Sequence, residues 1–305
     1  MLQYDLRCEM EENYKVNHLK GIVFMLLALL SFSISDTFIK YTVKQTGNDL
    51  SLFNIIFVRG IFTSLLILIS IFFFGKINLK KLFNDKRSYV RGIFEVMAAF
   101  CFLSSLILMP MADVYSLLNT APLIITATGA IFLKEQVGMR RWTAVILGFI
   151  GVLIVINPGN LKFGYFFILP IMTAIFLTLR DVVTKGYKDS SNSLEIIFIT
   201  SLLVTIAFGI TSIFFPFHIN YKIIFYISFS SIALTLAYLF SVLTILNAPI
   251  SLTSSFRYLI IVFGIVLGYI FFNEIPSINM IVGAIIISLS GLFVIKRQKE
   301  LGKIN

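Results

Sequence analysis

The chain alternates apolar runs of about 20 residues with short polar connectors. A helix needs about 20 apolar residues to cross the hydrocarbon layer of a membrane. The runs are about twice as long as a barrel strand and do not alternate polar and apolar positions, so we expect helices. The pattern predicts an all-α integral membrane protein with ten transmembrane helices, at about 20–42, 52–74, 90–107, 111–133, 140–157, 163–184, 194–215, 223–245, 251–272 and 278–295.

Composition supports this prediction. Of the 305 residues, 58% are hydrophobic and 13% are charged, whereas a soluble domain carries about a quarter charged residues. One globular core cannot bury this excess, because a folded domain still needs a polar surface. The composition therefore excludes a soluble enzyme, and the two cysteines, Cys8 and Cys101, are too far apart for a disulfide framework or a metal site.

The formal net charge of +10 follows the predicted topology. With the N-terminus in the cytoplasm, eighteen Lys and Arg residues lie in cytoplasmic segments and four lie outside. Cytoplasmic loops of membrane proteins hold an excess of Lys and Arg. We expect a multi-pass protein of the cell (inner) membrane with both termini cytoplasmic, and no nucleic-acid partner.

Short motifs recur in the same order in the two halves of the chain. Asp36–Lys40 matches Asp181–Lys185 at an offset of 145, and Phe132–Glu135 matches Phe271–Glu274 at an offset of 139. Each unit has five spans, so the second unit enters the membrane from the opposite side, which gives an inverted-topology repeat. The predicted units are a cytoplasmic tail (1–19), a first repeat (20–157), a second repeat (163–296) and a C-terminal tail (297–305).

Ionisable residues inside the spans are candidate functional residues, because a charge there costs at least ~2.5–3.5 kcal/mol unless it is paired or hydrated. Their order along the spans places them in two neutral groups. The outer group is Asp36, Lys40, Arg59 and Asp113, and the inner group is Glu95, Arg180, Asp181 and Arg257. We interpret each group as a gate that closes by ion pairing. The alternative is a static clamp between helices, and in that case Lys40 of the outer group only extends its ammonium toward the membrane surface. For Asp113 we expect only a helix-start role.

A polar stripe on the fourth span has a counterpart on the ninth. Tyr115, Asn119 and Pro122 are spaced i, i+4, i+7, which places them on one helix face. The matching positions are Ser254, Tyr258 and Ile261, with Arg257 beside them. Such stripes face the bundle interior, so these polar residues are candidate substrate contacts. Interhelical hydrogen bonds are the alternative for Asn119 and Ser254.

Prolines and two glutamates predict local structure. Pro122 and Pro170 predict kinks in the fourth and sixth spans. Glu135 and Glu274 each precede the next helix, where a carboxylate favours the N-terminus, and we interpret them as structural.

Several motifs together resemble a known family. They are Ser35–Lys40, Phe57–Arg59, Phe132–Glu135, Gly148–Val155, Leu179–Lys185 and Phe256–Tyr258. This set resembles the drug/metabolite transporter superfamily in its ten-helix form with two EamA-type repeats, over about residues 20–296. The resemblance implies a secondary active transporter of a small polar or amphoteric metabolite, similar to S-adenosylmethionine, riboflavin or an amino acid, that works by alternating access.

Enzyme motifs are absent from the sequence. It has no Gly-x4-Gly-Lys-Ser/Thr loop and only two histidines, so we expect no enzyme activity, no metal and no cofactor. The rival interpretation is an intramembrane enzyme, a channel or a structural protein that uses the same buried charges. Expected partners are the small-molecule substrate and the lipid bilayer. Buried carboxylates permit proton coupling without requiring it, and a single chain can enclose its own cavity, so a monomer can function and a dimer stays open.

Overall fold

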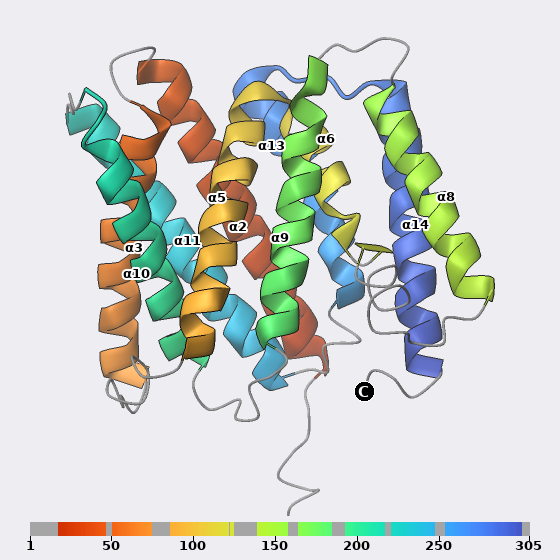
Figure 1. Cartoon of the computed structure of the whole chain (residues 1–305), viewed down its shortest axis with the longest axis horizontal. Helices are drawn as coiled ribbons and strands as arrows, with labels where there is room; N and C mark the ends of the chain where they lie inside the picture. The colour runs from red at the N-terminus through yellow and green to blue at the C-terminus, as the bar shows by residue number, and fades with distance from the viewer. Residues whose placement is uncertain are drawn as a thin grey trace, which may run out of the picture.

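The structure, a computed structural model, describes residues 18–46, 51–74, 86–121, 123–124, 139–157, 164–184, 193–216, 221–247 and 254–300. Within these ranges the chain forms helices and no strand, which confirms the predicted all-α fold (Figure 1). The ten α-helices are α2 (His18–Thr46), α3 (Leu52–Phe74), α5 (Lys86–Leu108), α6 (Met111–Leu118), α8 (Met139–Ile156), α9 (Ile168–Thr184), α10 (Ser193–Ser212), α11 (Tyr221–Asn247), α13 (Ile260–Phe272) and α14 (Ile278–Glu300). Two 3-10 helices, η2 (Gly164–Phe167) and η4 (Ser254–Leu259), lead into α9 and α13.

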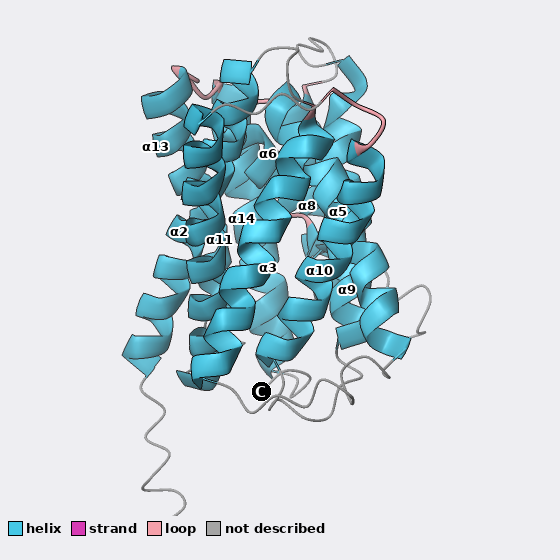
Figure 2. Ribbon diagram, turned by 90° about the vertical axis from the view of Figure 1, so that its left-hand side faces the viewer, coloured by secondary structure: helices cyan, strands magenta, loops and turns pink. Residues whose placement is uncertain are grey.

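The helices have the lengths and surfaces of membrane spans. Four described helices are long and apolar enough to cross a membrane, at Leu19–Gln45, Leu52–Phe73, Ser88–Leu108 and Tyr221–Ser241, and five shorter apolar helices lie beside them. The long helices lie side by side along the height of the bundle (Figure 2). Large apolar side chains stay exposed on its surface, such as Phe72 at 78% and Phe214 at 81%. Such a surface fits contact with lipid, because exposing so many apolar side chains to water over a whole bundle would be unfavourable.

Helix packing repeats between the two halves of the chain. The first predicted span, α2, packs along α11, and the sixth, α9, packs along α5. Exchanging the halves turns the first contact into the second. The same exchange leaves the contacts α3 with α10, α6 with α13, and α8 with α14 unchanged. The contact pattern therefore has the two-fold character expected of two similar five-helix units.

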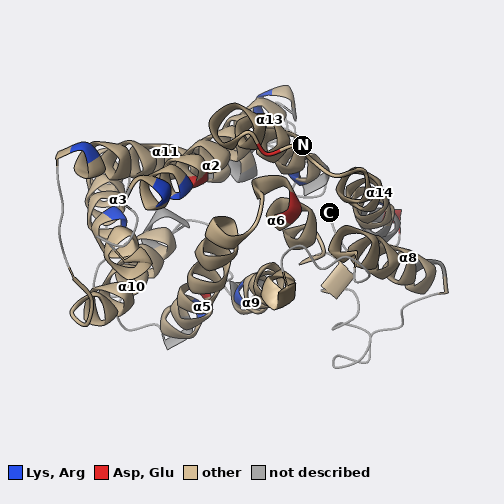
Figure 3. Cartoon of the chain, turned by 90° about the horizontal axis from the view of Figure 1, so that it is seen from above, with Lys and Arg blue, Asp and Glu red and all other residues tan. Residues whose placement is uncertain are grey.

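The short helix α6 lies at the centre of the bundle (Figure 3). Met111, Val114, Tyr115 and Leu117 are fully buried in the main apolar core, which includes residues of α2, α3, α5, α11, α13 and α14. An apolar helix that is buried on nearly all sides is typical of a core position.

The fourth span is interrupted. Helix α6 ends at Leu118, and a turn follows at Asn119–Thr120, where the amide of Asn119 donates to the Tyr115 carbonyl. The break lies where the sequence predicted a kink, since a proline lacks the N–H that continues a helix, but Pro122 itself lies outside the described residues. The remainder of the predicted span, 125–133, lies outside the described residues. The ninth span also departs from regular α geometry, since it begins with the 3-10 helix η4.

The kink predicted at Pro170 is wrong. Pro170 is buried in the first turn of α9, directly after η2. The first turn of a helix tolerates proline, because its missing N–H has no intrahelical acceptor there.

Candidate functional site

The charged residues lie at different depths in the bundle. We call the end that holds the start of α2 and the end of α14 the proximal end, and the opposite end the distal end (Figure 1). Helix α2 therefore runs toward the distal end, and α13 finishes there.

A buried ion pair lies near the distal end. Lys40 of α2 places its Nζ 2.5 Å from Oε1 of Glu274, the second residue after α13. The same Nζ donates to the Met109 carbonyl at 2.6 Å and lies 5.1 Å from the centre of the Phe272 ring. The Lys40 side chain is only 3% exposed. Lys40 therefore does not snorkel, and its partner is Glu274 rather than a member of the predicted outer group.

Glu274 also caps a helix. Its Oε2 accepts the backbone N–H of Met111, the first residue of α6, at 2.9 Å. Pro110 precedes this residue and offers no side-chain cap, so the carboxylate satisfies a free N–H and the helix dipole. The prediction that Glu274 serves the helix after it is wrong, because it serves α6 instead. Asp113 lies in the first turn of α6, where we expected it.

Asp36 lies one helical turn from Lys40 and is bound by a tyrosine. The Tyr115 hydroxyl of α6 donates to Oδ2 of Asp36 at 2.8 Å, and both side chains are buried. The Tyr115 ring stacks on Phe102 and lies against Gly264 of α13, where a Cβ would meet the ring at 2.5 Å. A glycine at this position therefore gives the ring the space it needs to reach Asp36.

Arg59 of α3 is buried against α2. Its Nη2 donates to Ser35 Oγ at 3.1 Å, and its Nε is buried without a hydrogen-bond partner in the described part of the chain. Ser35 and Ser230 exchange hydrogen bonds of 2.9 Å through their hydroxyls and carbonyls, which joins α2 to α11. Arg59 and Asp36 interact electrostatically. These two members of the outer group form no direct ion pair.

The inner group contains an ion pair of its own. Arg180 of α9 donates from Nη1 to Oε2 of Glu95 on α5 at 2.9 Å, with side chains 17% and 15% exposed. One turn earlier on α5, Arg91 bonds to the Thr200 hydroxyl of α10. Asp181 follows Arg180 in α9, and its side chain lies outside the described residues.

The stripe residues of spans four and nine lie in different environments. The side-chain amide nitrogen of Asn119 and the hydroxyl of Tyr258 are buried without hydrogen-bond partners in the described residues. The Tyr258 hydroxyl packs against Gly291 of α14, where no Cβ would fit. Arg257 is exposed, so it does not share the surroundings of Tyr258. The side chain of Ser254 lies outside the described residues.

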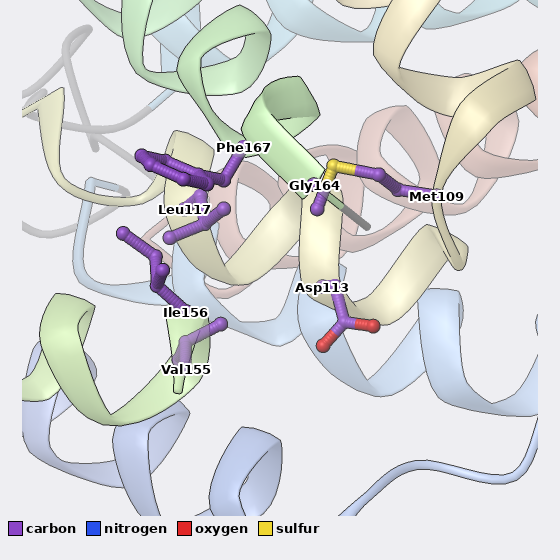
Figure 4. Close-up of a pocket in the computed structure, with 7 residues that line it drawn as sticks. All are labelled: Met109, Asp113, Leu117, Val155, Ile156, Gly164 and Phe167. Atoms are coloured by element: carbon purple, nitrogen blue, oxygen red, sulfur yellow. The ribbon is translucent and has the colours of Figure 1, made fainter. Parts of the chain in front are cut away.

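A small pocket opens beside α6 near the distal end (Figure 4). It is lined by Met109, Asp113, Leu117, Val155, Ile156, Gly164 and Phe167. Its free volume of about 10 Å³ is that of one water molecule. The pocket is therefore too small to hold a metabolite in this conformation.

Sequence reasoning missed three residues of this region: Glu274 as an ion-pair partner, and Ser35 and Ser230 as the contacts around Arg59. The recurrence of Glu135 at Glu274 was the available signal for the first, since it marks this connector in both repeats. Serines carry no comparable signal, because they are common in membrane helices of any role. In the described residues, no group of three His, Cys, Asp or Glu side chains could hold a metal ion.

The chain is similar to known transport proteins. Residues 19–157 match the EamA-like transporter family. A protein named "S-adenosylmethionine uptake transporter" from Rickettsia prowazekii is 27% identical over 293 residues, covering 93% of this chain and 95% of that protein. A "Riboflavin transporter" from Vibrio cholerae is 32% identical over 90 residues, 30% of each chain.

A solved crystal structure has the same fold. It superimposes with a TM-score of 0.63 and covers 92% of this chain and 98% of its own, at 14% identity. At this identity the likeness concerns the fold alone.

Proposed function

We propose that the chain is an EamA-type member of the drug/metabolite transporter superfamily and works as a secondary active transporter. It moves a small polar or amphoteric metabolite across the cytoplasmic membrane by alternating access between its two halves, 20–157 and 163–296. The names of its relatives support a metabolite as substrate. The two-fold packing of the helices supports a mechanism in which one half moves against the other.

The observation that supports this function best is the Lys40–Glu274 pair. Lys40 belongs to the first half and Glu274 to the second, and Glu274 also holds the start of the interrupted helix α6. A buried pair between the halves closes the distal end in this conformation. Opening that end requires the pair to separate and its charges to be hydrated, which gives the two-state element that alternating access needs.

Topology and coupling complete the proposal. The distribution of Lys and Arg supports cytoplasmic termini, and with that orientation the distal end faces outward from the cell (inner) membrane. A single chain can form the transport unit, and a dimer stays open. Protons are candidate coupling ions, because Asp36, Glu95 and Glu274 are carboxylates within the bundle. Transport of this kind requires no enzyme activity of the chain.

Counterflow in proteoliposomes tests the function. Vesicles that contain the purified chain are loaded with unlabelled S-adenosylmethionine, riboflavin or an amino-acid mixture, and labelled compound is added outside. We expect transient accumulation of label with one of these classes, without ATP, and no accumulation in empty vesicles. Equal signals in loaded, unloaded and protein-free vesicles for all classes would disprove transport of these metabolites.

The gate is tested by labelling in the same vesicles. In a chain with Cys8 and Cys101 replaced by Ser, a cysteine is placed at Asn119 and exposed to an impermeant thiol reagent at the distal face. Glu274→Gln should raise labelling, because the distal pair can no longer form, whereas Glu95→Gln should lower it. Unchanged labelling in both variants would mean that the ion pairs only clamp the helices.

A further inference from the structure

A buried anion and a buried cation lie close together without direct contact. Asp36 is 5% exposed and Arg59 is 7% exposed. Each acts electrostatically on the other, yet the ion pairs within 4.0 Å in the described residues are Lys40–Glu274 and Arg180–Glu95. Two opposite charges that are buried side by side gain most by direct contact, so their separation requires an explanation.

Neighbouring hydrogen bonds keep them apart. Tyr115 holds the carboxylate of Asp36 from α6, and Ser35 holds one nitrogen of Arg59. The Ser230 hydroxyl fixes Ser35, and the hydroxyl of Ser231 donates to the backbone carbonyl of Arg59 at 3.2 Å. These hydrogen bonds hold the two charged groups near each other and out of direct contact.

Arg59 retains unused hydrogen-bond donors. A guanidinium has five N–H donors in a planar fork, and in the described residues only the Ser35 contact uses one of them. Its Nε is buried without a partner. A buried charged donor without an acceptor is costly, and the acceptor that matches the fork is a carboxylate. The other titratable groups near Arg59 are Tyr115 and Tyr238. A protonated tyrosine has no negative charge, so neither can replace a carboxylate as the partner of Arg59.

We propose that Arg59 and Asp36 bind the two ends of a zwitterionic α-amino-acid group. The guanidinium of Arg59 receives the α-carboxylate, and the carboxylate of Asp36 receives the α-ammonium. This inference rests on the proposed transport function and names the part of the substrate that the site recognises. It favours S-adenosylmethionine and free amino acids over riboflavin, which has no such group.

Binding to the purified full-length chain in detergent tests the inference. The probes are S-adenosylmethionine, its decarboxylated analogue, and 5′-methylthioadenosine, which lacks the whole amino-acid group. We expect wild type to bind S-adenosylmethionine at least about tenfold more tightly than either analogue, since a hydrogen bond to a charged group contributes about 1.5–3 kcal/mol. Equal affinities for the three probes would overturn the proposal.

A variant assigns the carboxylate to Arg59. In Arg59→Lys, the discrimination between S-adenosylmethionine and its decarboxylated analogue should fall about tenfold, because a point charge cannot replace the fork. Discrimination that persists at the wild-type level would place the carboxylate elsewhere. Thr42→Ala is the matched control, since Thr42 is buried on the same helix as Asp36 and its hydroxyl donates to the Phe38 carbonyl.

Two outcomes separate this inference from the proposed function. Transport of riboflavin, with no binding of any ligand that carries an amino-acid group, would overturn the inference and leave transport intact. If neither riboflavin nor any amino-acid ligand shows counterflow, the proposed function fails with it.

Discussion

The two ends of the helix bundle hold their ion pairs in different ways. At the distal end, the side chains of Lys40 and Glu274 are 3% and 16% exposed, and Lys40 also contacts the Met109 carbonyl and the face of Phe272. Toward the proximal end, Arg180 and Glu95 are 17% and 15% exposed and are joined by a hydrogen bond of 2.9 Å. Both pairs connect the two halves of the chain. From this difference we infer that the two ion pairs, which lie at opposite ends of a two-fold bundle, do not stabilise the observed conformation equally.

Burial explains why the distal pair is the stronger constraint. Removing one partner of a buried pair leaves an uncompensated charge in a medium that solvates it poorly. A partly exposed pair loses less, because water solvates the remaining charge. In the observed conformation the distal pair is therefore expected to constrain the helices more firmly than the proximal pair.

The largest expected effect comes from breaking the distal pair. Lys40→Ala should lower the free energy of unfolding by about 3 kcal/mol, because it removes the ion-pair partner of Glu274, whose side chain is 16% exposed, and the donor to the Met109 carbonyl. Denaturant unfolding in detergent micelles measures it. Lys44→Ala is the control, since Lys44 is one turn away and exposed. The double variant Lys40→Met, Glu274→Leu should recover most of the stability. A Lys40→Ala protein as stable as the Lys44→Ala control would refute the comparison.

The sequence predicted the helices well and the distal pair poorly. Membrane thickness sets the length of an apolar run, so the predicted spans 52–74 and 140–157 agree closely with α3 (Leu52–Phe74) and α8 (Met139–Ile156). Ion-pair partners follow no comparable rule. Glu274 lies in a polar connector, and only tertiary folding brings that connector over the start of α6. The Glu95–Arg180 contact was accessible to sequence reasoning, because both residues fall inside spans and at similar depth.

The second effect sharpens the distal side of the comparison. Gly264→Ala places a Cβ 2.5 Å from the Tyr115 ring, so it should destabilise the chain by about 1–3 kcal/mol and weaken the hydrogen bond of Tyr115 to Asp36. Thermal unfolding measures the loss. Gly148→Ala is the comparison variant, because its Cβ meets the branched end of the buried Leu123 side chain and no aromatic ring. Equal losses in the two variants would show that the Tyr115 ring can move freely.

The third effect concerns the proximal pair. A double-mutant cycle with Glu95→Ala and Arg180→Ala should give a coupling energy of about 1 kcal/mol, because both side chains are partly exposed. The same cycle at Lys40 and Glu274 should give a value several times larger. Equal coupling energies at the two ends would remove the asymmetry on which the comparison rests.

The smallest effect comes from the aromatic ring beside the distal pair. Phe272 lies 5.1 Å from the Nζ of Lys40 and 4.6 Å from that of Lys44, and a cation over an aromatic face contributes about 0.5–1 kcal/mol. Phe272→Leu keeps an apolar side chain and removes the face, so we expect a loss of about 1 kcal/mol in thermal unfolding. Phe272→Tyr keeps the face and should lose less. In a Lys44→Ala background, Phe272→Leu should still cost part of this energy, because Lys40 retains its contact. If the cost disappears there, Lys44 alone uses the ring, and the distal pair is held by Glu274 and the Met109 carbonyl without aromatic support.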